Sequence, residues 1–159
     1  MKKIILTFLL FFTMLTFSYG QDLIIIRPNV AVGYFYADDT KGTAVNYGLN
    51  LLLSANEFQR YGLIFDHLTM PDNKEISYLC TGLMIEQVLL NYFNMGIGTI
   101  GYINLVQTGE NPFGLYTHLG FEYNFSRRFN TVASYRSDFI FRKHFTMYNA
   151  FQLGFGIRF

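Results

Sequence analysis

Three histidines, His67, His118 and His144, and a single cysteine, Cys80, are the side chains of this sequence best suited to acid–base, nucleophilic or metal chemistry. None of the histidines has a second ligand at the short spacing typical of a metal site. Cys80 lies within an apolar run and has no other cysteine to pair with, so we expect it to pack as a small hydrophobic residue. The sequence therefore predicts no metal site and no cofactor.

Charged side chains recur on one face of segments in which apolar and polar residues alternate. Successive side chains of a β-strand point to opposite faces, so residues two apart share a face. Four arginines, four carboxylates and a histidine fall on the polar face in this register: Arg27, Arg60, Arg136, Arg158, Asp66, Glu86, Glu122, Asp138 and His118. Such a set could form a polar conduit with His118 as a proton-linked gate, or a plug of ion pairs that fills an interior.

Eight alternating segments, each bounded by turn residues, follow one another along the chain. The fourth is the least regular, and taken alone it could also be a helix. The longest outward connections are expected at 70–75 and 107–111. Pro71 would break a strand ladder and so belongs in the first, and the stretch from Thr108 to Pro112 has the composition of a turn. The predicted strands span approximately residues 23–37, 43–54, 58–69, 76–88, 92–106, 113–125, 129–141 and 149–159.

The last predicted strand has the strictest alternation and ends on an aromatic residue. Its apolar side chains occupy every second position: Phe151, Leu153, Phe155, Ile157 and Phe159. This segment resembles the closing strand of bacterial outer-membrane β-barrels, and the chain beyond residue 20 resembles the outer membrane protein A-like barrel superfamily. The resemblance implies that these five residues are also the assembly signal for the barrel assembly machinery.

The first 20 residues have the pattern of a cleavable secretory signal peptide. Lys2 and Lys3 precede an apolar run from Ile4 to Phe17, and small residues precede a cleavage point before Gln21. The run is shorter than the roughly 20 residues that a membrane-spanning helix needs. Cleavage leaves residues 21–159 as one barrel domain with slightly more acidic than basic residues, which argues against a nucleic-acid partner.

We predict an all-β fold: an eight-stranded antiparallel up-and-down transmembrane β-barrel in the outer membrane of a Gram-negative bacterium. Hydrophobic residues make up 51% of the chain and charged residues 14%, and the hydrophobic residues are distributed over all eight segments. The polar face, rich in Gly, Asn, Tyr and charge, is expected to be too polar for a shared hydrophobic core. Because eight strands leave no continuous water channel, we favour the ion-pair plug over the conduit.

An enzymatic alternative comes from the lipid A 3-O-deacylase family, whose penultimate strand carries a His-x-Ser pair followed by Asn, with a Glu downstream. The matching strand here reads Ser137-Asp138-Phe139-Ile140 and lacks that pair. The most similar pattern is His67-Leu68-Thr69, with Thr in place of Ser and Glu75 as the one available orienting residue. We therefore interpret His67 as an outward-facing residue of the interfacial girdle and predict no catalytic residue.

The sequence thus favours a non-catalytic scaffold of the cell envelope, surrounded by outer-membrane lipid and lipopolysaccharide. Arg142, Lys143 and His144 lie at a predicted outward connection, where they would either contact lipopolysaccharide phosphates or form a solvated loop. The alternatives are a lipid A acyl-modifying hydrolase and a small adhesin. An adhesin of this size is expected to carry longer outward loops than the sequence allows.

Overall fold

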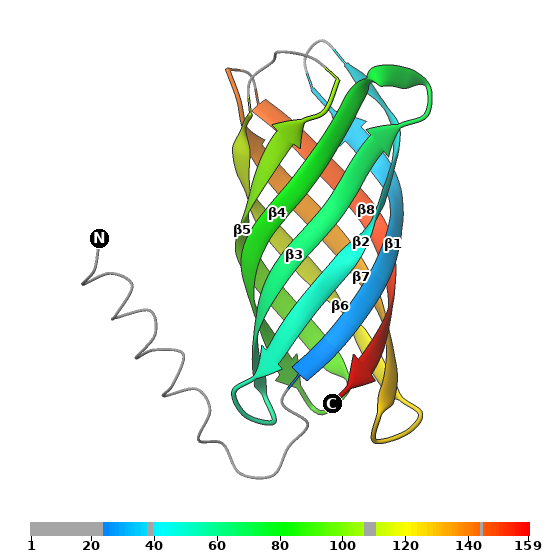
Figure 1. Ribbon diagram of the computed structural model, residues 1–159, viewed down its shortest axis with the longest axis vertical. Coiled ribbons are helices and arrows are strands. Elements are labelled where there is room, and N and C mark those ends of the chain that lie inside the picture. Colours follow the sequence, from blue (N-terminus) through cyan, green and yellow to red (C-terminus); the bar gives the residue numbers. More distant parts are fainter. Residues whose placement is uncertain (1–23, 38–39, 107–110, 144) are drawn as a thin grey trace, which may run out of the picture.

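The chain folds into one closed antiparallel β-barrel in which each strand pairs with the next along the sequence (Figure 1). This computed structural model describes residues 24–37, 40–106, 111–143 and 145–159. The predicted signal peptide at residues 1–20 lies outside the described residues. The strands are β1 (Ile24–Tyr36), β2 (Lys41–Ser54), β3 (Gln59–Met70), β4 (Asn73–Leu89), β5 (Phe93–Asn104), β6 (Phe113–Asn124), β7 (Phe129–Phe141) and β8 (Phe145–Arg158).

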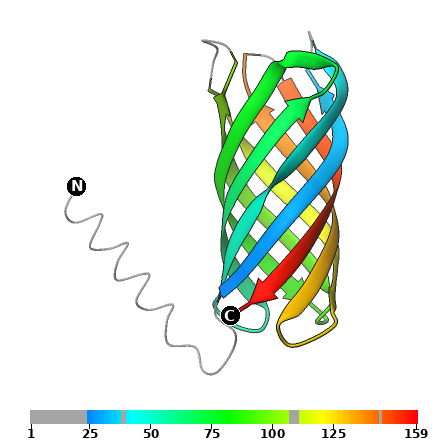
Figure 2. The same ribbon diagram turned by 45° about the vertical axis from the view of Figure 1, so that its right-hand side comes forward.

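The first and last strands close the ring. Val30 lies opposite Leu153 and Val32 opposite Phe151, so the predicted pairing of the last strand with the first is confirmed. The seam extends to the final residue, since the Phe159 amide donates to the Ile24 carbonyl at 2.9 Å. Figure 2 shows β1 in blue beside β8 in red along this seam, with the C-terminus at the end where β1 begins.

The exterior of the barrel is formed by the apolar face of every strand. Alternation places large hydrophobic side chains outward with high exposure, among them Val32, Leu83, Ile97 and Phe151. A face of this composition has no partner among the residues that the structure describes, so it requires an apolar environment. Among the described residues, no helix is both long and apolar enough to cross a lipid bilayer.

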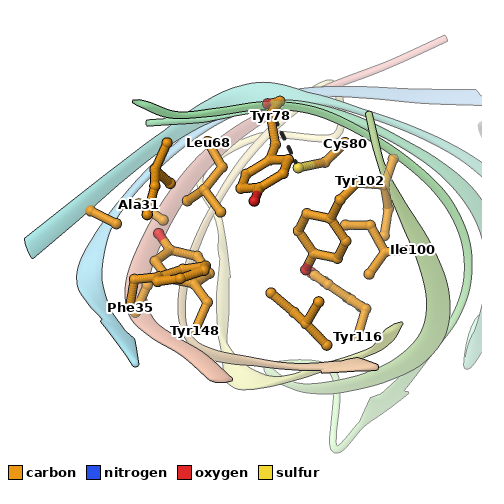
Figure 3. Packing of buried hydrophobic residues seen from close by; sticks show 14 of the residues in the cluster. Ala31, Phe35, Leu68, Tyr78, Cys80, Ile100, Tyr102, Tyr116 and Tyr148 are labelled. Carbon is orange, nitrogen blue, oxygen red and sulfur yellow. Dashed lines mark hydrogen bonds between the residues drawn. The ribbon is translucent and has the colours of Figure 1, made fainter. Parts of the chain in front are cut away.

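The interior contains a hydrophobic cluster, which corrects the prediction that the inward face is too polar for one. Phe35, Leu68 and Ile140 are at most 2% exposed, and Tyr102 and Tyr148 are equally buried among them. Figure 3 shows these tyrosines and their apolar neighbours pointing into the barrel from several strands. The sequence pattern hid this cluster because each strand contributes only a few of its members, and only closure brings them together.

Two strand boundaries differ from the prediction by three residues or more. The eighth strand begins at Phe145, four residues earlier than expected, because it pairs with β7 as far as Phe141. In place of the predicted loop at 70–75, the structure has a two-residue turn at 71–72, since β4 already starts at Asn73. The fourth segment is a strand, and its register with β3 shifts between Thr69 and Met70. The other expected long connection, at residues 107–110, lies outside the described residues.

Small inward residues allow neighbouring strands to approach closely within this narrow barrel. A substitution at Gly98 tests whether this close approach requires a residue without a side chain. A Cβ at Gly98 would collide with the Leu83 carbonyl oxygen and lie 2.9 Å from the Met84 Cα, whereas a Cβ at outward-facing Gly101 meets only the Thr81 carbonyl oxygen at 3.7 Å. We expect Gly98→Ala to lower the free energy of unfolding by about 1–3 kcal/mol. The midpoint of urea unfolding in detergent, monitored by the shift in gel mobility between folded and heated protein, measures the change in the free energy of unfolding. A midpoint for Gly98→Ala as high as that of the control Gly101→Ala would contradict it.

Candidate functional site

Glu86 is the centre of an ion-pair cluster in the half of the barrel where β1 begins and β8 ends. The Arg27 guanidinium contacts both of its carboxylate oxygens, at 2.7 and 3.2 Å, and Arg60 contacts it at 2.7 Å. Glu86 is fully buried. His118 Nε2 lies 3.2 Å from the same carboxylate, an ion-pair distance without hydrogen-bond geometry. Three nitrogen-bearing side chains from three different strands therefore converge on one carboxylate.

Glu122 joins the same cluster from β6. Arg60 binds it through two nitrogens, at 2.5 and 3.0 Å, and Arg27 lies 3.5 Å away. Arg158, whose side chain is partly exposed, contacts Glu122 at 2.6 Å, and Asn130 donates to it at 2.7 Å. Arg27 and Arg60 thus bridge the two glutamates, which makes one network of all five charged residues. We call these five residues and His118 the lower cluster.

A second network lies further from the termini and is built around Arg136. This fully buried guanidinium contacts Asp66 at 2.5 Å and Asp138 at 2.8 and 2.9 Å. Tyr102 donates its hydroxyl to Asp138 at 2.7 Å, and the Tyr116 ring lies under the guanidinium at 4.8 Å. Arg136, Asp66 and Asp138 are called the upper cluster. It sits inside the hydrophobic cluster, where a low dielectric strengthens each contact.

The structure therefore places all nine sequence-selected polar residues in the interior, but it divides them between two networks. Alternation predicts which residues face inward, and it cannot tell which of them meet. The lower cluster holds three arginines and two glutamates, and the upper cluster one arginine and two aspartates. The lower cluster therefore carries one excess positive charge and the upper cluster one excess negative charge. The two charges cancel over the interior as a whole.

Little space for solvent separates these groups. The cavity beside Arg27 and His118 measures about 10 Å³, which is roughly the minimum for one water molecule. At the outer mouth, Arg142 donates to the Tyr78 hydroxyl at 2.8 Å and its guanidinium lies 5.8 Å from the Tyr78 ring centre. Arg142 is therefore folded over the interior instead of pointing away into a loop. The filled interior is suited to rigidity and poorly suited to passing solutes.

His67 lies on the exterior, toward the end opposite the termini, as the sequence predicts. Its Nδ1 is 2.6 Å from the Tyr47 hydroxyl and its Nε2 is 2.8 Å from the Ser77 hydroxyl. Thr69, two residues along the strand, is the register partner of Ser77. Sequence reasoning missed Ser77, because it lies ten positions downstream on the next strand and only strand pairing brings it to the imidazole.

Metal and thiol chemistry have no evident place in the described residues. No group of three or more His, Cys, Asp or Glu side chains within the described ranges is arranged to hold a metal ion. Cys80 is fully buried in the hydrophobic cluster, with its Sγ 3.8 Å from the Tyr78 carbonyl oxygen. His144, the third histidine of the sequence, lies outside the described residues. The interior networks and the His67 group are thus the places where polar chemistry concentrates.

No protein-family model and no curated protein matches this chain. Solved structures do share its fold. Neisserial surface protein A aligns with a TM-score of 0.62 at 12% identity, covering 86% of this chain and 97% of that one. The N-terminal β-barrel domain of Pseudomonas aeruginosa OprF gives 0.60 at 16% identity, covering 88% and 99%. Ail, the attachment invasion locus protein of Yersinia pestis, solved with the heparin analogue sucrose octasulfate, gives 0.55 at 16% identity, covering 86% and 97%.

Arg136 is the residue whose loss should most disturb the interior. Arg136→Met leaves Asp66 and Asp138 buried together without their cation, and we expect the free energy of unfolding to fall by about 3–5 kcal/mol. The neutralised triple variant Arg136→Met/Asp66→Asn/Asp138→Asn removes the repulsion and should recover part of that loss. Urea midpoints of both variants and the wild type measure the effect. A single variant as stable as the wild type would show that the upper cluster is not needed for stability.

Proposed function

We propose that this chain, which has the fold of small eight-stranded outer-membrane barrels, is an integral outer-membrane protein of a Gram-negative bacterium and acts there as a scaffold of the envelope. The filled interior carries this proposal. A barrel occupied by two ion-pair networks and a hydrophobic cluster is stiff and closed, which suits a mechanical role better than transport.

The exterior supports the membrane location. Hydrocarbon offers no hydrogen-bond partners, so a sheet within it must have no free edge. The seam between β1 and β8 meets that requirement, and the outward side chains are apolar on every strand. Small solved outer-membrane barrels share this arrangement. The proposed role of Phe151 to Phe159 as an assembly signal for the barrel assembly machinery stays a prediction from the sequence.

Contact with lipopolysaccharide is the second part of the proposal. Lys143 is exposed at the end of the barrel opposite the termini, next to Arg142, which the Tyr78 hydroxyl holds in place. In bacterial barrels this end faces outward. Two adjacent cations at that height are suited to lipid phosphates. An adhesive role is less favoured, because three of the four connections at this end, around residues 37–40, 71–72 and 142–144, are short, and the fourth spans residues 105–112.

The closed interior predicts that small solutes do not pass. We expect liposomes that contain the refolded protein to release an encapsulated small ion or sugar at the rate of protein-free liposomes, because the arginines and carboxylates of the interior are engaged with one another. Planar-bilayer conductance provides an independent measurement. Stable single-channel steps that depend on the wild-type interior would overturn the scaffold proposal.

The proposed lipopolysaccharide contact predicts that removing the positive charges of Arg142 and Lys143 weakens binding to lipopolysaccharide. Lys143→Ala combined with Arg142→Gln keeps a donor for Tyr78 while removing both positive charges. We expect its affinity for lipopolysaccharide-containing vesicles to fall roughly 30-fold, since each of the two cations near an anionic surface contributes about 1 kcal/mol. Vesicle co-sedimentation measures the change. The control Arg127→Gln/Arg128→Gln removes two exposed arginines from the β6–β7 connection at the opposite end. Equal loss in both double variants would refute a specific outer contact.

A further inference from the structure

The exterior of β2, β3 and β4 carries a serine, a histidine and a tyrosine in one hydrogen-bonded row. Tyr47 and His67 are register partners on β2 and β3, and their rings meet edge to face with centres 5.0 Å apart. Leu79 lies opposite His67 on β4, and Ser77, two residues before it, shares its outward face. The row Tyr47–His67–Ser77 therefore follows from strand register, and its two hydrogen bonds measure 2.6 and 2.8 Å.

This arrangement has the geometry of an activated nucleophile. With its proton on Nδ1, the imidazole donates to the Tyr47 oxygen and its Nε2 accepts from the Ser77 hydroxyl. A hydroxyl within hydrogen-bond reach of a base that a third group orients is the general requirement for nucleophilic catalysis by serine. None of these three side chains belongs to the buried core, since Tyr47 is exposed and His67 and Ser77 are partly exposed. A substrate can thus approach from outside the barrel.

An apolar groove lies directly beside this row, on the same outer face. It measures about 510 Å³, and its lining includes Phe65, Thr81, Leu83, Thr99 and Gly101. Phe65 is two residues from His67 on β3, and Thr81 on β4 is the register partner of Phe65. The lining combines the small residues Thr and Gly with the larger Phe and Leu. The groove therefore extends from the polar row toward the middle of the strands.

The row and the groove lie at different heights along β4, and the two heights fit the ester bond and the acyl chain of one lipid. Thr81 is four residues beyond Ser77, a distance of about 13 Å along β4 at 3.3 Å per residue. The row is close to the turn at residues 71–72, at the end opposite the start of β1 and the end of β8 (Figure 1). In a membrane barrel the strand ends lie near the interface, where the ester bonds of membrane lipids are found, and a groove nearer the middle of the strands lies at the depth of acyl chains.

We propose that Ser77 and His67 hydrolyse an acyl ester of a lipid in the surrounding leaflet, with the acyl chain held in the groove. This activity goes beyond the scaffold role. Ser77 Oγ attacks the ester carbonyl carbon while its proton passes to His67 Nε2. The carbon–oxygen bond to the lipid alcohol then breaks, the alcohol takes that proton, and the acyl group stays on Ser77. Water, with His67 as base, attacks the acyl-serine, Ser77 recovers its proton, and a fatty acid leaves.

Ser77 lies beside a shift in the register between β3 and β4, since Thr69 pairs with Ser77 whereas Met70 pairs with Asn73. Tyr47 is a positioning residue in this scheme, because it contacts His67 and not the reacting atoms.

The test measures free fatty acid by mass spectrometry after the purified full-chain protein is placed in vesicles. One set contains only a diacyl glycerophospholipid, and the other also contains lipopolysaccharide. We expect release by the wild type in at least one set, and a loss of at least 100-fold in Ser77→Ala and in His67→Gln. Release with glycerophospholipid alone identifies that lipid as a source, and release only with lipopolysaccharide identifies its acyl esters.

A matched control is available on the other side of the barrel. Ser137 is also an outward-facing serine, but its hydroxyl donates to Asn149 at 2.7 Å instead of to an imidazole. Ser137→Ala should retain full release. Tyr47→Phe should shift the acidic limb of the pH–rate profile, which a purely structural role would leave in place. Heat-modifiable gel mobility verifies that each variant is folded.

Covalent labelling gives a second measurement that does not depend on finding the right lipid. A long-chain alkyl fluorophosphonate should modify Ser77, as mapped by peptide mass spectrometry, and the labelling should be lost in His67→Gln. The proposal is overturned if wild-type protein and Ser77→Ala release equal amounts of fatty acid in both vesicle sets and Ser77 stays unlabelled. The scaffold proposal is tested separately by solute flux, so either one can fail alone.

Discussion

Backbone hydrogen bonding between β1 and β8 is the constraint on which the rest of this structure depends. A sheet of eight strands has two edges, and each edge carries polar groups that hydrocarbon cannot satisfy. Pairing from Ile25 with Arg158 to Tyr36 with Met147 removes both edges together. Closure also defines an inside. Every alternating position on every strand must then either fit into a narrow interior or face the surroundings, and this accounts for the distribution of side-chain types along the whole chain.

The interior shows how a narrow barrel accommodates charge. An isolated buried ion is costly, and a pair recovers that cost only with good geometry and additional hydrogen bonds. Here each buried carboxylate meets at least one guanidinium, and Arg27 and Arg60 each meet two glutamates. The lower cluster carries an excess positive charge and the upper cluster an excess negative charge. Their mutual attraction along the barrel adds to the local pairs, and the hydrophobic cluster around Arg136 reduces competition from water.

Interior and exterior therefore support two separate chemistries. The interior arginines and carboxylates are engaged with one another, which suits a stiff scaffold. The exterior row of Tyr47, His67 and Ser77 is open to the surroundings and adjoins an apolar groove. Strand register connects the two faces, because the pairing of β3 with β4 that brings Arg60 to Glu86 also brings His67 near Ser77.

The sequence by itself determined the number of strands, the barrel class and the side chains that face inward, since a period of two is a local property of the extended backbone. Glu86 and Arg136 could be assigned to the interior in this way. Tertiary structure alone decided which groups meet: Arg27 with Glu86, 59 positions apart, Phe35 with the hydrophobic cluster, and Ser77 with His67. These contacts depend on the register between strands and on closure of the ring. Both result from pairing over long sequence distances, which no short pattern encodes.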